Sequence, residues 1–255
     1  MDNLRSTDGQ NEIVIKDLVK DFGDVKAVNG LNLEIKKGEM FGFLGPNGAG
    51  KSTTINILCG LLAPTAGTVL YGPYDIKKDM QKIKERIGVC PQESAAFKFL
   101  SGRENLELFG TLHGLKKDLV KERAEKLINQ ANLSEAAGRK VKGYSGGMMR
   151  QLNLMMALIS HPDIVFLDEP TVGMDARARR TTWEYIGSLK EQGKTVILTT
   201  HYIEEAQALS DRVGIIDYGK LIDLGTSQEL MEKHDSKDLE EVFLKITGRR
   251  IAEGS

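Results

Sequence analysis

Residues 45–53 decide the fold, and they read Gly45, Pro46, Asn47, Gly48, Ala49, Gly50, Lys51, Ser52 and Thr53. An apolar, strand-like segment at 40–44 comes directly before them, and a helical pattern at 52–62 follows. Glycines let the backbone turn tightly enough to aim consecutive N–H groups at a phosphate, and a helix N-terminus adds partial positive charge. The strand, glycine-rich turn and helix therefore predict a loop that binds a nucleoside triphosphate.

The side chains at the end of this loop suit phosphate chemistry. Lys51 is expected to neutralise the outer phosphates, and the Ser52 hydroxyl is expected to bind a Mg²⁺ that bridges them. Thr53 is placed to bond the inner phosphates. A glycine-rich stretch alone can be only a tight connection, but the Lys-Ser pair argues against that reading. The loop by itself does not distinguish a kinase, a GTPase and an ATPase.

Two carboxylates, Asp168 and Glu169, follow the apolar residues 164–167. Because ligands of parallel sheets bind at the carboxyl ends of the strands, we expect Asp168 to hold the Mg²⁺ shell and Glu169 to act as general base toward a water. A helix-capping acidic pair ahead of Pro170 is the alternative, and the phosphate loop favours the catalytic reading. His201, after the apolar residues 196–198, is expected at the same sheet edge.

A second glycine-rich turn contains Ser145, Gly146 and Gly147 and opens an apolar helix. This turn is a second candidate phosphate cradle. A serine cap on a helix whose methionines pack in the core is the alternative. That alternative explains the methionines but not two glycines in a first helical turn, where each costs about 1 kcal/mol relative to alanine.

Composition excludes several classes of protein. The chain has 40% hydrophobic and 28% charged residues, which is typical of a soluble globular protein. The formal net charge is −1, so we expect no nucleic-acid partner. Cys59 and Cys90 are the only cysteines and are expected to be buried free thiols. The longest strictly apolar stretch, 154–159, is far shorter than the roughly 20 residues of a membrane-spanning helix.

The hydrophobic pattern predicts an α/β fold with distinct subdomains. Alternating residues at 12–18 and 31–35 predict a small antiparallel sheet, and continuous apolar runs predict a parallel sheet covered on both faces. Helical spacing predominates between residues 93 and 162. We therefore expect a nucleotide-binding core with the antiparallel sheet at 10–92 and 163–233, a helical subdomain at 93–162, and a C-terminal helix and tail at 234–255.

Taken in chain order, the phosphate loop, Gln92, Tyr144-Ser-Gly-Gly147, the Asp-Glu pair and His201 resemble the ATP-binding subunits of ABC transporters. The resemblance spans nearly the whole chain and implies a P-loop NTPase (RecA-like) core with a mixed sheet. It also implies roles for single residues: Phe22 stacks on adenine, Gln92 links Mg²⁺ to the helical lobe, Asp175 crosses to a second subunit, and His201 contacts the terminal phosphate. Read alone, Gln92 would be only a polar loop residue.

The same resemblance implies a head-to-tail dimer, of two identical chains or of two related ATPase subunits, that encloses two MgATP. In it, the Ser145 turn of one subunit closes over the ATP of the other. Tyr144 and Met148 depart from the commoner leucine and glutamine. These residues, the motif at 171–175 and the segment at 239–248 look like the branch that drives ABC-2-type exporters.

The resemblance thus implies ATP and Mg²⁺ as cofactors, an integral membrane permease as partner, and a peripheral location on the cytoplasmic face of the cell membrane. The alternatives are a soluble ABC ATPase outside transport, such as one in iron–sulfur cluster assembly, and a non-catalytic nucleotide-gated scaffold, against which Glu169 and His201 argue. A permease contact is expected near Gln92, where the chain carries Ala95, Ala96, Phe97, Phe99 and Leu100. Local core packing of these residues is an equally weighted alternative.

Overall fold

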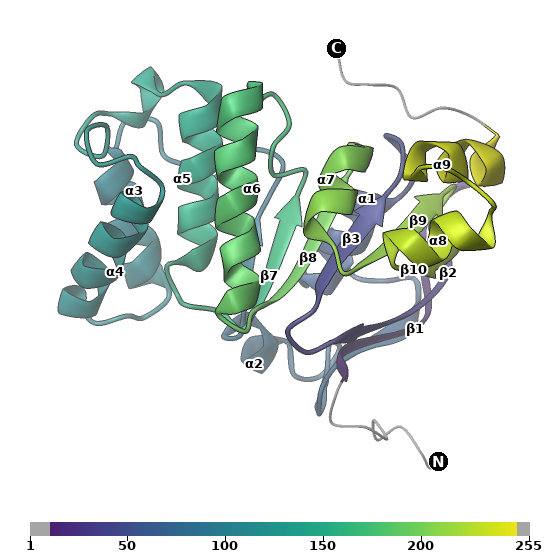
Figure 1. Cartoon of the computed structure of the whole chain (residues 1–255). Coiled ribbons are helices and arrows are strands. Elements are labelled where there is room, and N and C mark those ends of the chain that lie inside the picture. Colours follow the sequence, from purple (N-terminus) through teal and green to yellow (C-terminus); the bar gives the residue numbers. More distant parts are fainter. Residues whose placement is uncertain (1–10, 249–255) are drawn as a thin grey trace.

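The structure is a computed structural model that describes residues 11–248; the expected domain start at residue 10 and the tail at 249–255 lie outside this range. Within that range, two sheets and the helices around them make up the molecule (Figure 1). The expected α/β class with a mixed sheet and an antiparallel sheet is confirmed.

The larger sheet carries the nucleotide-site motifs. Among the described residues it has six strands in the order β10-β9-β3-β8-β7-β6. Its members are β3 (Met40–Leu44), β6 (Ile87–Cys90), β7 (Ile164–Asp168), β8 (Thr195–Thr200), β9 (Arg212–Asp217) and β10 (Lys220–Gly225). The sheet is parallel except at its edge strand β10, which pairs antiparallel with β9. Consequently β3, β7 and β8 end at one common edge, and the chain leaves them there with Gly45, Glu169 and His201.

The smaller sheet is antiparallel and has the order β2-β1-β4-β5. It contains β1 (Asn11–Phe22), β2 (Val25–Lys36), β4 (Ala66–Tyr71) and β5 (Tyr74–Asp75). Irregularities in the pairing of β1 with β2, for example between Ile15 and Leu18, interrupt the strict alternation of side chains. β1 and β2 thus extend beyond the segments 12–18 and 31–35, in which apolar and polar residues alternate.

The helices divide into three groups along the chain. Near the smaller sheet lie α1 (Lys51–Leu58) and α2 (Met80–Lys84). The expected helical segment contains α3 (Gly102–Leu112), α4 (Lys117–Gln130), the 3-10 turn η1 (Val141–Gly143) and α5 (Gly146–Leu158). The last group is α6 (Ala176–Glu191), α7 (Ile203–Leu209), α8 (Ser227–Lys233) and α9 (Leu239–Thr247).

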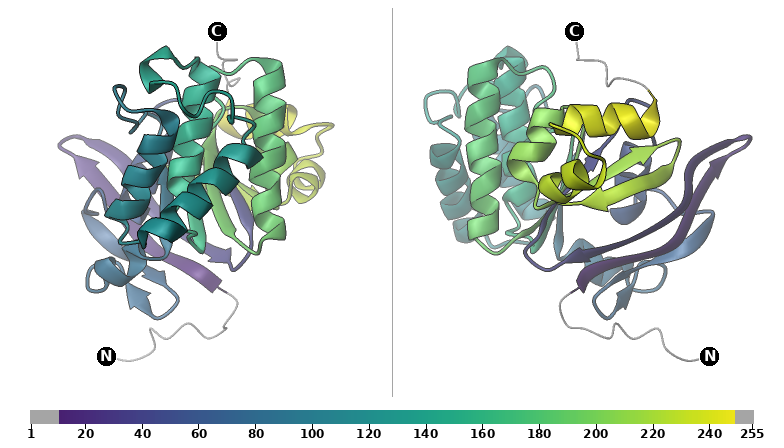
Figure 2. Two further views of the ribbon diagram at one scale, coloured as in Figure 1. Left: turned by 90° about the vertical axis from the view of Figure 1, so that its left-hand side faces the viewer. Right: turned by 45° about the vertical axis from the view of Figure 1, so that its right-hand side comes forward.

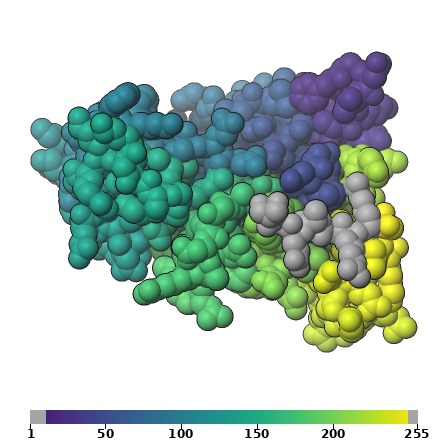
Figure 3. All heavy atoms as spheres, turned by 90° about the horizontal axis from the view of Figure 1, so that it is seen from above, coloured from purple at the N-terminus to yellow at the C-terminus, as the bar shows by residue number. Residues whose placement is uncertain are grey.

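The helical segment and the β1–β2 hairpin lie at opposite ends of the molecule (Figure 2, right). Seen from above, the teal helices form one end, whereas the hairpin and the yellow α8 and α9 form the other (Figure 3). The parallel sheet lies between these ends and connects them.

The parallel strands are buried on both faces, as their continuous apolar runs predict. Consecutive β3 side chains enter different clusters: Met40 packs with residues of α5 and α6, and Phe41 packs with α1 and the antiparallel sheet. Cys59 and Cys90 are buried free thiols, as expected. This packing on both faces of the sheet holds the carboxyl ends of its strands in place, where the candidate site residues lie.

Candidate functional site

Two glycines of the phosphate loop, Gly45 and Gly50, are required by close backbone approaches. A side chain at Gly50, whose φ is 101°, would place its Cβ 2.2 Å from the carbonyl oxygen of Ala27. A Cβ at Gly45 would lie 2.3 Å from the carbonyl oxygen of Ile216. The loop is therefore held between β2 and the end of β9, and it turns directly into α1.

Lys51 is buried at the first position of α1. Its Nζ donates to the carbonyl oxygens of Gly45, at 2.7 Å, and Pro46, at 3.1 Å, and lies 3.6 Å from Glu169 Oε1. Burial lowers the pKa of Lys51, although the nearby carboxylates of Glu169 and Asp168 act in the opposite direction. A phosphate in this loop would offer the ammonium group a further charged acceptor.

Asp168 ends β7 and receives two hydroxyl donors on one oxygen. Ser52 Oγ donates to Asp168 Oδ1 at 3.0 Å, and Thr199 Oγ1 donates to the same atom at 2.5 Å. The three side chains come from α1, β7 and the neighbouring strand β8. The parallel sheet thus brings together the hydroxyl and the carboxylate that the sequence assigned to the Mg²⁺ shell.

Glu169 lies at the centre of a hydrogen-bonded group. His201 Nδ1 lies 3.1 Å from its Oε1, and Gln92 Nε2 donates to its Oε2 at 3.1 Å. Burial alone would raise the pKa of Glu169, but the His201 bond and the Lys51 charge outweigh burial and hold that pKa below its ordinary value. Glu169 is therefore an ionised carboxylate near neutral pH, as a base that accepts a proton requires.

The backbone also orients Glu169. Its φ is 49°, a left-handed conformation that costs a non-glycine residue about 1–2 kcal/mol. Its N–H donates both to the carbonyl oxygen and to the hydroxyl of Thr199, each at 3.1 Å. Strand β8 therefore holds the strained turn that directs this carboxylate toward Lys51 and Gln92.

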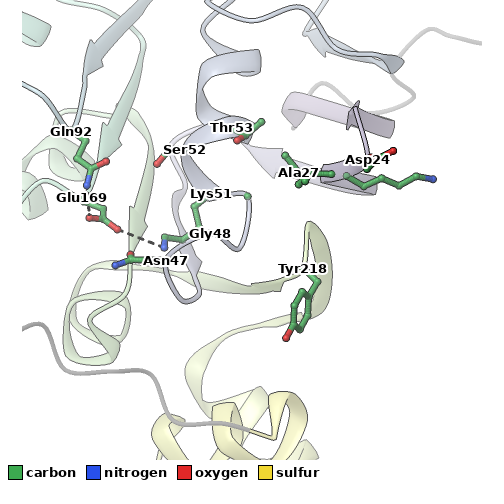
Figure 4. Close-up of a pocket in the computed structure, with 13 residues that line it drawn as sticks. Asp24, Ala27, Asn47, Gly48, Lys51, Ser52, Thr53, Gln92, Glu169 and Tyr218 are labelled. Atoms are coloured by element: carbon green, nitrogen blue, oxygen red, sulfur yellow. Dashed lines mark hydrogen bonds and ion pairs between the residues drawn. The ribbon is translucent and has the colours of Figure 1, made fainter. Parts of the chain in front are cut away.

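A cavity of about 630 Å³ is lined by four of these side chains, Lys51, Ser52, Gln92 and Glu169, and not by Asp168 or His201. Its lining residues are Asp24, Val25, Lys26, Ala27, Asn47, Gly48, Gly50, Lys51, Ser52, Thr53, Gln92, Glu169 and Tyr218. In Figure 4, Gln92, Glu169 and Ser52 lie on one side of the loop, and Ala27 and Tyr218 lie on the other. The volume lies within the roughly 300–1,000 Å³ of small-molecule sites. The cavity therefore offers room for more than the phosphates alone.

Phe22, expected to stack on adenine, is not among these lining residues. It ends β1, is 51% exposed and has the Lys20 ammonium 5.0 Å from its ring centre. Its strand partner Val25 lines the cavity instead. The aromatic side chain that does line the cavity is Tyr218, in the β9–β10 turn, a residue that belongs to no motif in the sequence.

The second glycine-rich turn does not line this cavity. Ser145 caps α5 by accepting from Met148 N at 3.2 Å, which is the alternative role foreseen for it. Added Cβ atoms at Gly146 and Gly147 would lie 4.0 Å from Gly173 O and 3.6 Å from Ala178 Cβ, so the turn lies against the start of α6. Asp175 likewise caps α6, accepting from Ala178 N at 2.8 Å, and does not line the cavity.

The donor set beside the loop fits Mg²⁺. Ser52 and Asp168 provide a hydroxyl and a carboxylate, and the Gln92 amide oxygen belongs to a side chain that lines the same cavity. Among residues 11–248 there is no group of three or more histidine, cysteine or acidic residues suited to a metal. Mg²⁺ keeps waters and takes ligands from substrate phosphates, so a site with few protein oxygens suits it.

Sequence reasoning missed two polar residues besides Tyr218. Thr199 bonds to both Asp168 and Glu169, yet a threonine inside an apolar strand gives no signal of this role. Arg150 donates from its guanidinium to the main-chain oxygen of Gln92. Its position five residues after Ser145, on the opening turns of α5, was the available clue.

The comparisons with known proteins now identify the family. The protein-family model described as "ABC transporter" matches residues 28–172. The chain belongs to the ABC transporter family. It is 41% identical to the daunorubicin resistance ATP-binding protein DrrA3 of Streptomyces coeruleorubidus, over 93% of this chain and 75% of that protein. It is 40% identical to the Nod factor export ATP-binding protein I of Cupriavidus metallidurans, over 90% and 76%.

A solved structure agrees with this assignment. The dimeric, post-hydrolysis state of an ATP-binding cassette with ADP and Pi has a TM-score of 0.75 and 28% identity, over 84% of this chain and 98% of that one. The expected P-loop fold and the membership among ABC export ATPases are confirmed. This ABC protein is an ATP-binding ATPase subunit, and the comparisons support the transport role and not the soluble alternative. In the described part of the chain, every helix is too short or too polar to span a bilayer.

Proposed function

We propose that this ABC subunit hydrolyses ATP with Glu169 as general base. The hydrogen bonds and the ion pair around Glu169 support this role, because they hold the carboxylate ionised at the edge of the phosphate loop. A water between Glu169 and the terminal phosphorus gives up a proton to the carboxylate and forms the new P–O bond. The bond to ADP breaks, and Lys51 and the loop N–H groups stabilise the negative charge.

Ser52, Asp168 and Gln92 are the proposed protein ligands of Mg²⁺. When bound, the ion would neutralise charge on the outer phosphates. Ser52 and Asp168 are already oriented toward each other by a 3.0 Å hydrogen bond. His201, 3.1 Å from Glu169, is proposed to contact the terminal phosphate from the end of β8.

We further infer that two chains pair head to tail around two ATP molecules. One observation carries this proposal: the turn of Ser145, Gly146 and Gly147 lies outside the cavity that holds Lys51 and Glu169. The α5 start nevertheless presents N–H groups of the kind that bind anions. A second copy, of this chain or of a related subunit, would supply the turn to the cavity of the first.

Glu169→Gln tests both the chemistry and the dimer. The variant keeps the side chain's shape but cannot accept the proton, so ATP hydrolysis should fall at least about 100-fold. With MgATP it should accumulate as a dimer in size-exclusion chromatography with light scattering. Asp163→Asn, a carboxylate change just before the opposite end of β7, is the matched control and should keep wild-type turnover.

Wild-type turnover by Glu169→Gln would remove Glu169 from the proposed role. Full loss of turnover with no ATP-dependent dimer would leave the base assignment standing and contradict the head-to-tail arrangement. The two parts of the proposal therefore fail separately.

A groove beside Gln92 is the proposed docking site for an integral permease, of ABC-2 type, at the cytoplasmic face of the membrane. The groove has a volume of about 670 Å³ and includes Ala95, Phe109, Leu112 and Met156 in its lining. Shortly after Ala95 in the chain, Phe97 and Phe99 are 54% and 77% exposed, so core packing does not account for these two side chains. Exposed aromatic side chains beside an apolar groove favour a protein contact.

Phe97→Asp tests the docking site. We expect ATP binding to stay unchanged and co-purification with the permease to be lost, because a charge in an apolar contact is strongly unfavourable. Ile222→Asp, an exposed apolar residue on β10, is the control. Unchanged assembly of the Phe97 variant would contradict the proposed surface.

A further inference from the structure

A third, smaller cavity lies away from the nucleotide loop, between the helical segment and the core. It has a volume of about 250 Å³. Its lining residues are Leu119, Glu122, Arg123, Lys126, Leu127, Gln130, Leu158, His161, Pro162, Tyr185, Leu189, Gln192 and Lys194. His161 and Pro162 precede β7, and Lys194 precedes β8. The cavity therefore opens at the amino edge of the parallel strands, opposite the edge that carries Asp168 and Glu169.

The charges in this cavity are unbalanced. Arg123, Lys126 and Lys194 contribute three cations, and Glu122 is the one carboxylate in the lining. None of these four residues forms an ion pair within the described chain. Arg123 donates only to a neutral acceptor, the carbonyl oxygen of Ile159, at 3.1 Å. The lining thus concentrates positive charge without neutralising it.

Lys194 is the most constrained of these cations. It is only 5% exposed, and its Nζ lies 3.1 Å from His161 Nδ1, a neutral partner. The negative charge of Asp163 acts on Lys194, but this carboxylate already forms an ion pair with Arg86, with 3.2 Å between Oδ2 and Nε. Burial, together with the Arg123 charge, lowers the pKa of Lys194. A buried cation without a charged partner is unfavourable, so the site favours an added anion.

His161 also carries backbone strain at this position. Its φ is 59°, an uncommon conformation for a residue other than glycine. Burial and the charges of Lys194 and Arg123 lower the pKa of His161, so near neutral pH it is an uncharged hydrogen-bonding group. It can accept from Lys194 in the free protein or bond to a bound oxyanion.

We propose that this cavity is a binding site for a small organic oxyanion, whose charge is held by Arg123 and Lys126 from α4 and by Lys194 from the core. Leu127, Leu158, Tyr185 and Leu189 provide the apolar part of the lining. The volume is below the roughly 300–1,000 Å³ of drug-sized sites, which limits the ligand to one small apolar group beside its charge. Because the cations come from both sides of the cavity, one bound ligand would link the helical segment to the core.

Phenyl phosphate is the probe, and the full chain is saturated with MgADP so that the phosphate loop is occupied. Binding is measured by calorimetric titration at constant ionic strength. Lys194→Gln should weaken binding at least about tenfold, since the variant loses a charge-assisted hydrogen bond to the anion. Arg123→Gln is the second variant, should the first not fold. Lys121→Gln, on an exposed position of α4, is the matched control and should bind like the wild type.

Two readouts separate a binding role from a structural one. In buffer with chloride only, Lys194→Gln should unfold at or above the wild-type temperature, because the substitution removes a buried cation that has no charged partner. Phenyl phosphate should raise that temperature in the wild type and in Lys121→Gln but not in Lys194→Gln. Absence of binding to the wild type, or equal affinities in all variants, would overturn the proposal.

Discussion

Thr199→Val is the change that most directly tests how the sheet builds the nucleotide site. Valine has nearly the shape of threonine, so it fits the fully buried position on β8. It removes the hydroxyl that donates to Asp168 Oδ1 at 2.5 Å and accepts from Glu169 N at 3.1 Å. The main-chain bond from Glu169 N to Thr199 O, also 3.1 Å, remains.

The expected magnitude follows from these contacts. Asp168 is 6% exposed and keeps only the Ser52 donor, so the lost bond to a charged group costs about 2 kcal/mol. If that free energy is lost in the transition state, turnover falls roughly 30-fold. Binding of MgADP should weaken as well, because the carboxylate is no longer held in one orientation.

Thr195→Val provides the control from the other end of the same strand. Its hydroxyl accepts from Gly38 N at 2.9 Å, a neutral bond that is remote from the cavity, so its loss costs about 1 kcal/mol of stability. Urea unfolding measures stability in both variants, and titration with MgADP and a phosphate-release assay measure the site. Equal nucleotide affinity and turnover in the two variants would contradict the role of β8 in positioning Asp168 and Glu169.

Two further outcomes are expected from the same structure. Gly50→Ala should destabilise the fold and abolish nucleotide binding, because its Cβ would overlap Ala27 O at 2.2 Å. The Cβ of Gly48→Ala has open space, so this variant should lose only about 1–2 kcal/mol of stability through backbone strain. Equal urea unfolding of the two variants would contradict this prediction. Burial raises the pKa of Glu205 above its ordinary 4.5, so its contribution to stability is full below pH 4.5 and is lost as pH rises through the folded pKa. As pH rises through the folded pKa, the free energy of unfolding of Glu205→Gln should therefore increase relative to that of the wild type. A difference between the two proteins that stays constant with pH would refute this prediction.

The sequence predicts elements best where local chemistry and periodicity agree. Apolar positions recur at helical spacing over residues 176–191, and α6 has these bounds, with Asp175 as its N-cap. By contrast, α1 ends at Leu58 and not at residue 62, because Gly60 adopts φ 69° and Asn56 O accepts from the following turn. Helical spacing of side chains does not report such a left-handed end.

The candidate site was predictable where a residue type is unusual for its position. Charged residues are rarely buried unless they have a partner or a function. Three charged residues lie among apolar or glycine-rich segments and could be selected on this ground: Lys51, Asp168 and Glu169. Thr199 could not be found in this way, since a threonine in a buried strand is ordinary. Its role arises only from the register of β8 with β7, which pairs Thr199 with Asp168.

The structure joins the second glycine-rich turn to Glu169, the proposed general base, through one loop residue. Ser145 caps α5, and Arg150 on that helix donates to the main-chain oxygen of Gln92. The Gln92 side chain donates to Glu169. Because Gln92 is held by the helical segment at its backbone and by Glu169 at its side chain, a displacement of α5 must change one of these two bonds. Any partner that moves the helical segment therefore alters the environment of the proposed base without touching the nucleotide.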